Sequence, residues 1–290
     1  MKNTNRIPLQ RLFLLTGLIF LGQFLMACNE KETTEKYIGI QLWSVRNAMN
    51  ENPENTLQAL GEMGYAFVEA AGYNNGKFYG MDPQVFRELV NAHGMDFLSS
   101  HVMLPIEGMD EGEIMQWWQT CIDAHQKAGV KYLVQAAMGG EASQNIEALD
   151  RYIEMFNTVG EMAQEAGIKF GFHNHAVEFQ TIDGQVIMDR MLQNTNPDYV
   201  FFQLDLYWIN QGGADPVDYF QKYPGRFALW HVKDQAELGA SGQINFERIF
   251  NAADQSGMEY LVVEVENYNY NPLESVRISL DYLIDADFVQ

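Results

Sequence analysis

Eight short apolar runs, each followed by a longer amphipathic stretch, are the feature that most constrains how this chain folds. The apolar runs have the length of buried strands, and the stretches between them repeat apolar residues at helical spacing. The predicted strands cover residues 37–45, 67–71, 97–102, 132–137, 169–175, 200–206, 227–232 and 260–266. The predicted helices cover residues 55–63, 83–93, 111–128, 143–166, 185–193, 216–222, 245–256 and 272–286. Each strand is thus followed by a helix, as in a parallel sheet with crossover connections.

Glycines at the predicted helix ends support this alternation. Gly64, Gly129 and Gly257 each stand between a helix and the next strand, where a left-handed residue ends a helix without a Cβ penalty. Eight units in about 250 residues fit a closed barrel, whereas an open doubly wound sheet usually has fewer strands and a glycine-rich loop after the first. No such loop follows the first predicted strand. We therefore predict one domain over residues 37–290, an α/β protein with the (β/α)8 TIM barrel fold.

The segment before the first strand has the organisation of a bacterial export signal. Three basic residues precede an apolar run over residues 12–24, which is shorter than the roughly 20 residues of a membrane-spanning helix. Residues 25–28 (LMAC) resemble the lipobox of bacterial lipoproteins. We predict a signal peptide over residues 1–28, a lipidated Cys28 and a polar tether over residues 29–36. The alternatives are an ordinary secretory signal with a chance cysteine and an uncleaved anchor. The predicted location is the cell envelope, in the periplasm or at the outer membrane, with membrane contact only through the lipid on Cys28.

The net charge narrows the range of partners. The chain carries 39 acidic and 18 basic residues, and the predicted signal peptide contains three of the basic ones. Because nucleic acids bind through clustered Lys and Arg, a formal charge of −21 disfavours them as partners. Apart from Cys28 the only cysteine is Cys121, in a predicted helix, so no disulfide framework can form within the chain.

Polar residues interrupt several of the apolar runs near one end. In a TIM barrel the reactive groups lie at the C-terminal ends of the strands, so these residues are candidates for the site. A carboxylate such as Asp205 is costly to bury unless it is paired or bound to a metal. A structural salt bridge is the alternative for one residue alone, but the pattern recurs on several strands. The candidates are Glu69, His101, Gln135, His173, Asn174, His175, Glu178, Asp205, His231, Lys233, Asp234, Glu264 and Glu266.

Five segments resemble the xylose isomerase-like family of sugar phosphate isomerases and epimerases. Residues 170–179 (FGFHNHAVEF) are similar to the His-Asn-His-x-x-Glu-Phe segment of the family. Residues 204–208 (LDLYW), 230–234 (WHVKD) and 263–264 (VE) follow in the family's order. Residues 242–246 (GQINF) resemble the turn that precedes the last helices. The resemblance covers the predicted barrel and is specific for the superfamily, but it does not identify a substrate.

The resemblance implies one divalent metal ion, which could be Mn²⁺, Co²⁺, Zn²⁺ or Mg²⁺. The implied ligands are Glu178, Asp205, His231 and Glu264. Some relatives place the first of these ligands where His173 stands, so the sequence leaves Glu178 and His173 as alternatives. Carboxylates with one imidazole and no cysteine suit these ions, and the lack of a cysteine argues against a structural zinc site.

Related isomerases and epimerases remove the proton α to a carbonyl and form a metal-stabilised enediolate. The base should be a carboxylate or an imidazole within hydrogen-bond reach of that carbon, and the candidates are Glu178, Glu264 and His175. Lys233 would add positive charge near the developing oxyanion, and a structural salt bridge is its alternative role.

Four residues are expected to contact the sugar. Glu69 and His101 would orient its hydroxyl groups, and the alternative for both is ordinary capping or packing. His173 is a further substrate contact if it is not a ligand. Trp208 offers a ring on which the apolar face of a sugar can stack.

We therefore expect a metal-dependent keto-sugar isomerase or epimerase acting on a small carbohydrate. The strand ends offer almost no basic residue beyond Lys233, which disfavours a phosphate group on the substrate. A lyase or dehydratase that acts on a keto-sugar or a 3-keto-glycoside through the same site is one alternative. A non-catalytic carbohydrate-binding lipoprotein is another. An endonuclease-type DNA repair role within the same superfamily is disfavoured by the acidic charge.

Overall fold

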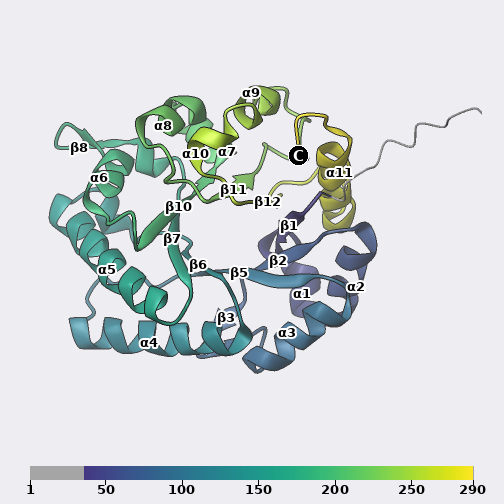
Figure 1. Ribbon diagram of the computed structural model, residues 1–290, viewed down its shortest axis with the longest axis horizontal. Helices are drawn as coiled ribbons and strands as arrows, with labels where there is room; N and C mark the ends of the chain where they lie inside the picture. Colours follow the sequence, from purple (N-terminus) through teal and green to yellow (C-terminus); the bar gives the residue numbers. More distant parts are fainter. Residues whose placement is uncertain (1–35, 290) are drawn as a thin grey trace, which may run out of the picture. The chain divides into compact units, whose positions relative to one another are not determined.

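A closed barrel of eight parallel strands forms the centre of the protein, and helices surround it (Figure 1). The computed structural model describes residues 36–289. The order of strands around the barrel is β1-β12-β11-β10-β7-β6-β5-β2, which closes on itself. The barrel strands are β1 (Ile38–Gln41), β2 (Phe67–Ala70), β5 (Asp96–Val102), β6 (Tyr132–Gln135), β7 (Lys169–His173), β10 (Val200–Asp205), β11 (Leu229–Val232) and β12 (Tyr260–Val263). The predicted TIM barrel is confirmed.

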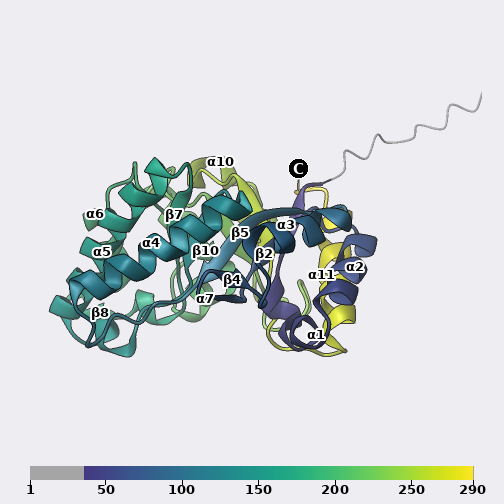
Figure 2. The ribbon, with the colours of Figure 1, turned by 90° about the horizontal axis from the view of Figure 1, so that it is seen from below.

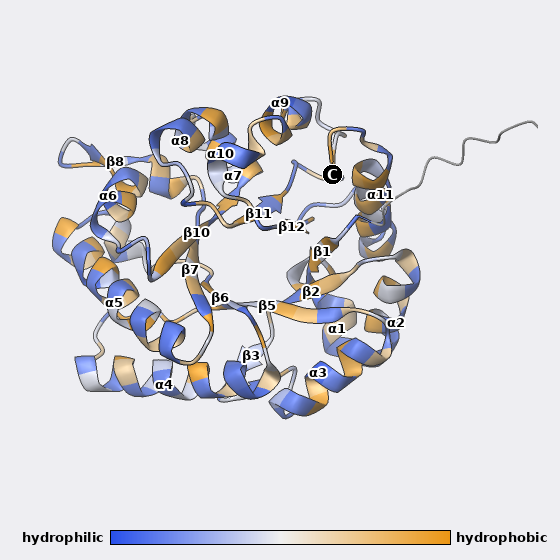
Figure 3. Ribbon diagram, viewed as in Figure 1, coloured by the Kyte–Doolittle hydropathy of each residue, from blue (hydrophilic) through white to orange (hydrophobic). Residues whose placement is uncertain are grey.

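Amphipathic helices pack their apolar faces on the outside of this barrel, so that orange and blue stripes alternate along them in Figure 3. In α4, for example, Ile114, Trp118, Cys121 and His125 recur at helical spacing and are buried. Cys121 is a free, buried thiol, as expected. The helices are α1 (Arg46–Glu51), α2 (Pro53–Met63), α3 (Pro83–Ala92), α4 (Glu111–Ala128), α5 (Ile146–Glu165), α6 (Ile187–Asn194), α7 (Leu206–Gln211), α8 (Pro216–Lys222), α9 (Phe246–Phe250), α10 (Ala253–Ser256) and α11 (Pro272–Asp285).

The first strand is shorter than predicted. It ends at Gln41, and a 3-10 turn, η1 (Leu42–Val45), follows it. The side-chain oxygen of Gln41 accepts a hydrogen bond from the backbone N–H of Trp43, so Gln41 caps the turn and the extended backbone stops there. The apolar residues Leu42 and Val45 extended the predicted strand. They are buried, but they lie on the turn.

Two predicted helices also differ in detail. The helix predicted to start at residue 185 starts at Ile187, because residues 185–186 form strand β9 (Gln185–Val186), which pairs with β8 (Thr181–Ile182) in a hairpin. The helix predicted over residues 245–256 is divided into α9 and α10. Glycines end helices as expected, since Gly64, Gly129 and Gly257 are left-handed C-caps.

The C-terminal ends of the barrel strands meet at one end of the molecule. Figure 2 shows α1, α7 and β4 (Lys77–Phe78) at this end. Strand β4 pairs with β3 (Tyr73–Asn74) in a hairpin that follows β2. Two further 3-10 turns are η2 (Gly140–Ser143) and η3 (Val177–Phe179), and the second of these follows β7. The connections at this end build the candidate site.

The predicted signal peptide, the lipidation at Cys28 and residues 29–35 of the predicted tether lie outside the described residues. Lys36, the last residue of that tether, donates hydrogen bonds from its ammonium group to the carbonyls of Leu283, Ile284 and Ala286 at the end of α11. Within residues 36–289, no helix combines the length and the apolar character needed to cross a membrane.

A buried histidine makes the stability of the barrel depend on pH. His125 is fully buried in α4, and its Nδ1 atom lies 2.7 Å from the carbonyl oxygen of Cys121. Burial lowers the pKa of His125 to about 4, against about 6.5 in an unfolded chain. Below pH 6.5 the unfolded chain therefore binds a proton that the folded protein does not bind. We expect the free energy of unfolding to fall by up to about 3 kcal/mol from this residue as the pH drops from 6.5 to 4. Urea unfolding of the wild type and of His125→Gln over this range tests the expectation, and equal pH slopes would contradict it.

Candidate active site

Four buried side chains meet at the C-terminal ends of four neighbouring strands. His173 is the last residue of β7, Asp205 the last of β10, and His231 lies on β11, while Glu264 directly follows β12. Asp205 and His231 are register partners on adjacent strands. Each of the four offers one nitrogen or oxygen atom, and these atoms all lie within 4.8 Å of one another. We call these four residues the ligand group, since this arrangement could hold a metal ion.

One carboxylate oxygen of Asp205 caps a helix, and the other has no hydrogen-bond partner. Its Oδ1 atom accepts hydrogen bonds from the backbone N–H groups of Tyr207 and Trp208, at 2.9 and 2.7 Å, and so caps α7. Its Oδ2 atom is buried and has no hydrogen-bond partner. This atom lies 3.9 Å from His173 Nε2 and 4.0 Å from His231 Nδ1. A buried carboxylate oxygen without a partner is costly, and a cation between these atoms would remove that cost.

Nearby charges set the protonation of the ligand group. Burial raises the pKa of Asp205 to about 7, although Lys233 acts in the opposite direction. Burial would lower the pKa of His231, but the carboxylates of Glu264 and Glu69 raise it to about 10. Without a metal, His231 therefore carries a proton on each ring nitrogen at neutral pH. Because a ligating nitrogen must be free, metal binding here would release a proton.

Glu69, Gln41, Ser99 and Gln203 form a buried polar layer that contacts His231 inside the barrel. The Nε2 atom of His231 lies 2.6 Å from Glu69 Oε1, and its Nδ1 atom lies 3.2 Å from Glu264 Oε2. Glu69 is fully buried and also accepts hydrogen bonds from Gln41, Ser99 and Gln203, at 2.7, 2.5 and 2.8 Å. Burial opposes the charge on Glu69, but His101 and His231 lower its pKa to about 2. Glu69 is therefore an anion that fixes the orientation of His231, as carboxylates do behind metal-binding histidines.

This geometry corrects the expectation that Glu69 orients sugar hydroxyls. Its side chain is inside the barrel, and each of its oxygens is already bonded to protein groups. His101 is also tied to this layer, with Nε2 2.5 Å from Gln203 Oε1 and 3.1 Å from Glu69 Oε1. Its ring is partly exposed, so His101 forms part of the floor of the site.

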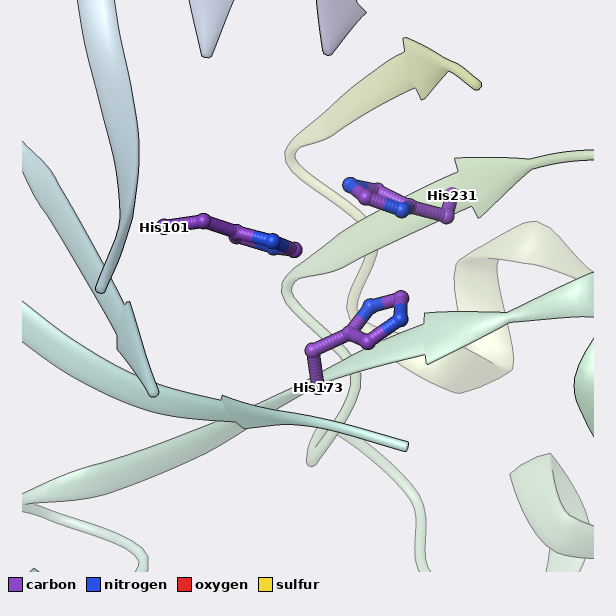
Figure 4. A group of neighbouring side chains, drawn as sticks. All are labelled: His101, His173 and His231. Atoms are coloured by element: carbon purple, nitrogen blue, oxygen red, sulfur yellow. The ribbon is translucent and has the colours of Figure 1, made fainter. Parts of the chain in front are cut away.

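Three imidazole rings converge above this layer, and Figure 4 shows His101, His173 and His231 pointing toward one another. The rings of His101 and His231 are stacked, with centroids 4.9 Å apart, and those of His173 and His231 are 4.5 Å apart. Burial lowers the pKa of His173 well below its ordinary value, with repulsion from His231 and His101 adding to the effect. The Nδ1 atom of His173 is buried without a partner. A neutral imidazole of this kind is a suitable metal ligand.

Glu178 does not lie in the ligand group. The chain turns after β7, and Glu178 falls on η3, where its Oε2 atom accepts a hydrogen bond of 2.6 Å from the backbone N–H of His175. It is buried, and burial raises its pKa to about 7. The structure thus places His173, and not Glu178, beside Asp205, His231 and Glu264. The reason is that β7 ends at His173, which puts this side chain at the barrel mouth, whereas Glu178 lies on the turn that follows.

Lys233 and Trp208 complete the wall of the site. The Lys233 ammonium group donates to Glu264 Oε2 at 3.0 Å, is bound to Glu266, and lies 3.9 Å from Asp205 Oδ2. These carboxylates raise the pKa of Lys233 above its ordinary value even though burial opposes this. The same ammonium lies 4.9 Å from the centre of the Trp208 ring. The sequence offered a salt bridge to Asp234 or Asp205 as the alternative role; the close partners are Glu264 and Glu266, with Asp205 at 3.9 Å, and the ammonium also lies next to the ligand group.

His175 is the one predicted base whose side chain is not buried. Its ring is partly exposed, with its centroid 5.0 Å from that of His173 and 5.7 Å from that of Trp208. Burial and the nearby Lys233 lower the pKa of His175 to about 4, so its imidazole is neutral at pH 7. The other two candidates, Glu178 and Glu264, are buried.

Comparison with known proteins identifies the family. Residues 57–286 match the family described as xylose isomerase-like TIM barrel. The chain belongs to this family. A sugar phosphate isomerase/epimerase from Parabacteroides distasonis is 31% identical and superposes with a TM-score of 0.83, over 90% of this chain and 97% of that one. The IOLI protein, solved with a zinc atom bound, is 15% identical and has a TM-score of 0.67, over 87% of this chain and 98% of that one; it shares the fold.

Curated relatives of this xylose isomerase-like barrel include inosose dehydratases. The enzyme from Clostridium perfringens is 23% identical over an alignment of 273 positions, which covers 80% of this chain and 90% of that enzyme. The enzyme from Geobacillus kaustophilus is 22% identical over an alignment of 196 positions, which covers 62% of this chain and 61% of that enzyme. The chain therefore spans less than two thirds of this last relative. Both kinds of relative, isomerase/epimerase and dehydratase, are enzymes.

Sequence reasoning missed the uncharged members of the polar layer. Gln41, Ser99 and Gln203 are fully buried and hold Glu69, but amides and hydroxyls in an apolar run attract less attention than charges. Their position along the strands could have identified them. Gln203 stands two residues before Asp205 on the same strand, so both side chains face the barrel interior.

Replacing Glu69 tests whether this layer tunes the ligand group. Glu69→Gln keeps the shape of the side chain but removes the charge that holds the proton on His231 Nε2. We expect the affinity for Zn²⁺ to fall about 10-fold to 100-fold, the usual effect of losing such a partner. Calorimetric titration of the metal-free protein measures it. Glu259→Gln is the matched control, because Glu259 pairs with Lys169 and lies outside the ligand group. An unchanged affinity in Glu69→Gln would show that Glu69 serves packing alone.

Proposed function

We propose that this protein is a metal-dependent enzyme that isomerises or epimerises a keto-sugar by removing the proton α to its carbonyl. The observation that carries the proposal is the ligand group, above all the buried Oδ2 atom of Asp205 that has no partner within it. His173, Asp205, His231 and Glu264 would hold the ion, with His173, the alternative considered from the sequence, in the place where Glu178 was predicted. A divalent ion bound there would polarise a carbonyl and the adjacent hydroxyl group.

The protein's own groups have separate roles in this proposal. His175 takes the α-proton, because its imidazole is neutral at pH 7, is partly exposed and lies beside His173 and Trp208. Lys233 places a fixed positive charge where negative charge develops on the substrate oxygen. Trp208 offers its ring to the apolar face of the sugar. Returning the proton to the other face of the same carbon gives an epimer, and returning it to the neighbouring carbon gives an isomer.

The charges around the site favour an unphosphorylated sugar. The strand ends offer almost no basic residue for a phosphate beyond Lys233, which is already paired with Glu264 and Glu266. A cavity of about 490 Å³ next to the site is lined by eight residues, and none of them is charged. We therefore propose that the carbohydrate is neutral, although the Parabacteroides relative is called a sugar phosphate isomerase/epimerase.

A dehydratase reaction is the second candidate, and the inosose dehydratase relatives favour it. The first step would be the same removal of the α-proton. The C–O bond at the β-carbon then breaks, a carbon–carbon double bond forms between the α- and β-carbons, and the leaving hydroxide takes a proton and departs as water. The product distinguishes the two candidates, since only this one loses water.

Export to the cell envelope also belongs to the proposal, as does the lipid on Cys28. Mass spectrometry of the protein from a bacterial membrane fraction tests it, and an N-terminus without lipid would contradict it.

The decisive experiment measures metal and proton exchange on the same purified protein. We expect about one equivalent of Mn²⁺, Co²⁺, Zn²⁺ or Mg²⁺, and deuterium entering α to the carbonyl of a keto-sugar in D₂O, with both lost after chelation. NMR of the products separates an epimer or isomer from a dehydrated sugar. A folded protein that neither binds any of the four ions nor exchanges a proton would favour the non-catalytic carbohydrate-binding alternative.

A further inference from the structure

A polar cavity at the barrel mouth is lined by none of the residues that carry out the chemistry described above. Its volume is about 490 Å³, within the range of roughly 300–1,000 Å³ typical of ligand pockets. The connections that follow β10, β11 and β12 form its walls, and these strands also supply Asp205, His231 and Glu264. The lining residues are Tyr207, Gln235, Ala236, Ala240, Ser241, Asn267, Tyr268 and Asn269.

Short stretches of chain connect the cavity to the reactive groups. Tyr207 stands two residues after Asp205, and its ring lies 5.0 Å from that of Trp208. Asn267 directly follows Glu266, which binds the Lys233 ammonium. The cavity therefore lies among the same connections that carry the reactive groups at the barrel mouth.

The lining has the chemistry of a sugar-binding surface. The amide side chains of Gln235, Asn267 and Asn269 can both donate and accept hydrogen bonds, as hydroxylated rings require. Tyr207 and Tyr268 add aromatic rings for the apolar face of a sugar. No charged side chain lines the cavity. A neutral polyhydroxylated ring matches this lining better than an ionic or a purely apolar group.

Buried carboxylates hold the walls in place before any ligand binds. Asp234 accepts hydrogen bonds from the backbone of Gln235 and from Ser241. Glu237 accepts from the backbone and the side chain of Asn269, at 2.9 and 2.6 Å. The Tyr268 hydroxyl donates to the carbonyl of Ser44 at 2.9 Å. A wall that is ordered in advance lowers the entropic cost of binding.

We propose that this cavity is a second sugar subsite, so that the substrate is a neutral glycoside of two linked rings with the reacting ring at the ligand group. The inference rests on the proposed function for the reacting ring, but the second subsite is a binding property that can be measured without turnover. A free monosaccharide would leave the cavity to water. A disaccharide would fill it.

Calorimetry with matched sugars tests the subsite. The probes are methyl glucosides and methyl galactosides against α- and β-linked disaccharides of glucose and galactose, with glucose 6-phosphate as the charged comparison. We expect at least one disaccharide to bind about tenfold or more tightly than its methyl glycoside, since one or two added hydrogen bonds give a difference of that size. No preference for any disaccharide, or tightest binding of glucose 6-phosphate, would overturn the proposal.

Two variants locate the effect. Ala240→Trp fills the cavity from an exposed position, and Asn267→Ala removes an amide from its wall. Both should abolish the disaccharide preference and leave the Kd of the methyl glycoside within twofold of the wild type. Asn91→Ala, at an exposed position on α3, is the control and should keep the preference. Equal weakening of both sugars, or of neither, would contradict the subsite. If the protein exchanges no proton but prefers disaccharides, the proposed reaction fails and the subsite stands.

Discussion

Replacing Asp205 with Asn should remove the bound metal and the proton-exchange activity together while the barrel stays folded. The Asn side chain is uncharged, and its NH2 group takes the place of the free Oδ2 atom. The ligand group therefore loses one of its two carboxylates. The capping of α7 survives, because an Asn oxygen can still accept the hydrogen bonds from Tyr207 and Trp208. Elemental analysis should find well under 0.1 equivalents of metal, and deuterium exchange should fall by about three orders of magnitude or more.

The stability of the same variant separates this role from a structural one. In the metal-free protein, burial of a carboxylate oxygen without a partner is unfavourable, so Asp205→Asn should not lower the unfolding temperature. Asp215→Asn is the matched control, since Asp215 also caps a helix, α8, but pairs with Arg248 at the surface. Its metal content should equal that of the wild type. Full metal content in Asp205→Asn would mean that Asp205 is not a ligand.

The sequence predicted the barrel from strong local signals, and it predicted three residues of the ligand group from such signals together with the family resemblance. Eight strands alternating with helices admit few architectures, and the strand ends of a TIM barrel must converge. Asp205, His231 and Glu264 each interrupt an apolar run at such an end. A charged or imidazole group in this position needs a partner, which made these residues visible without coordinates.

The remaining parts of the site depend on where the backbone turns, and no local pattern determines this. His173 and Glu178 are five residues apart, and the choice between them follows from the end of β7 and the η3 turn. Glu69 carries the same kind of signal as Asp205, yet it lies deeper, where Gln41 and Gln203 enclose it. Depth along the barrel axis depends on the stagger between strands, which a single sequence does not reveal.

Replacing Lys233 with Met should change metal binding and catalysis in opposite directions. The Lys233 ammonium offsets the negative charges of Glu264 and Glu266 and part of that of Asp205. Without it the site is more negative, so we expect a divalent ion to bind at least as tightly. The same loss removes the positive charge next to the developing oxyanion. We expect kcat for proton exchange to fall about 10²-fold to 10³-fold, the usual effect of removing one such group from a transition state.

Metal titration and deuterium exchange on Lys233→Met test this pairing of effects. Lys169→Met makes the same change at an exposed lysine paired with Glu259 and should alter neither quantity. The metal-free Lys233→Met protein should unfold at a lower temperature than the wild type, because it leaves Glu264 buried with less compensation, and added metal should restore much of this loss. If metal affinity and kcat fell together, Lys233 would act by holding the ligand group in shape. If kcat were unchanged, the oxyanion would be stabilised by other groups.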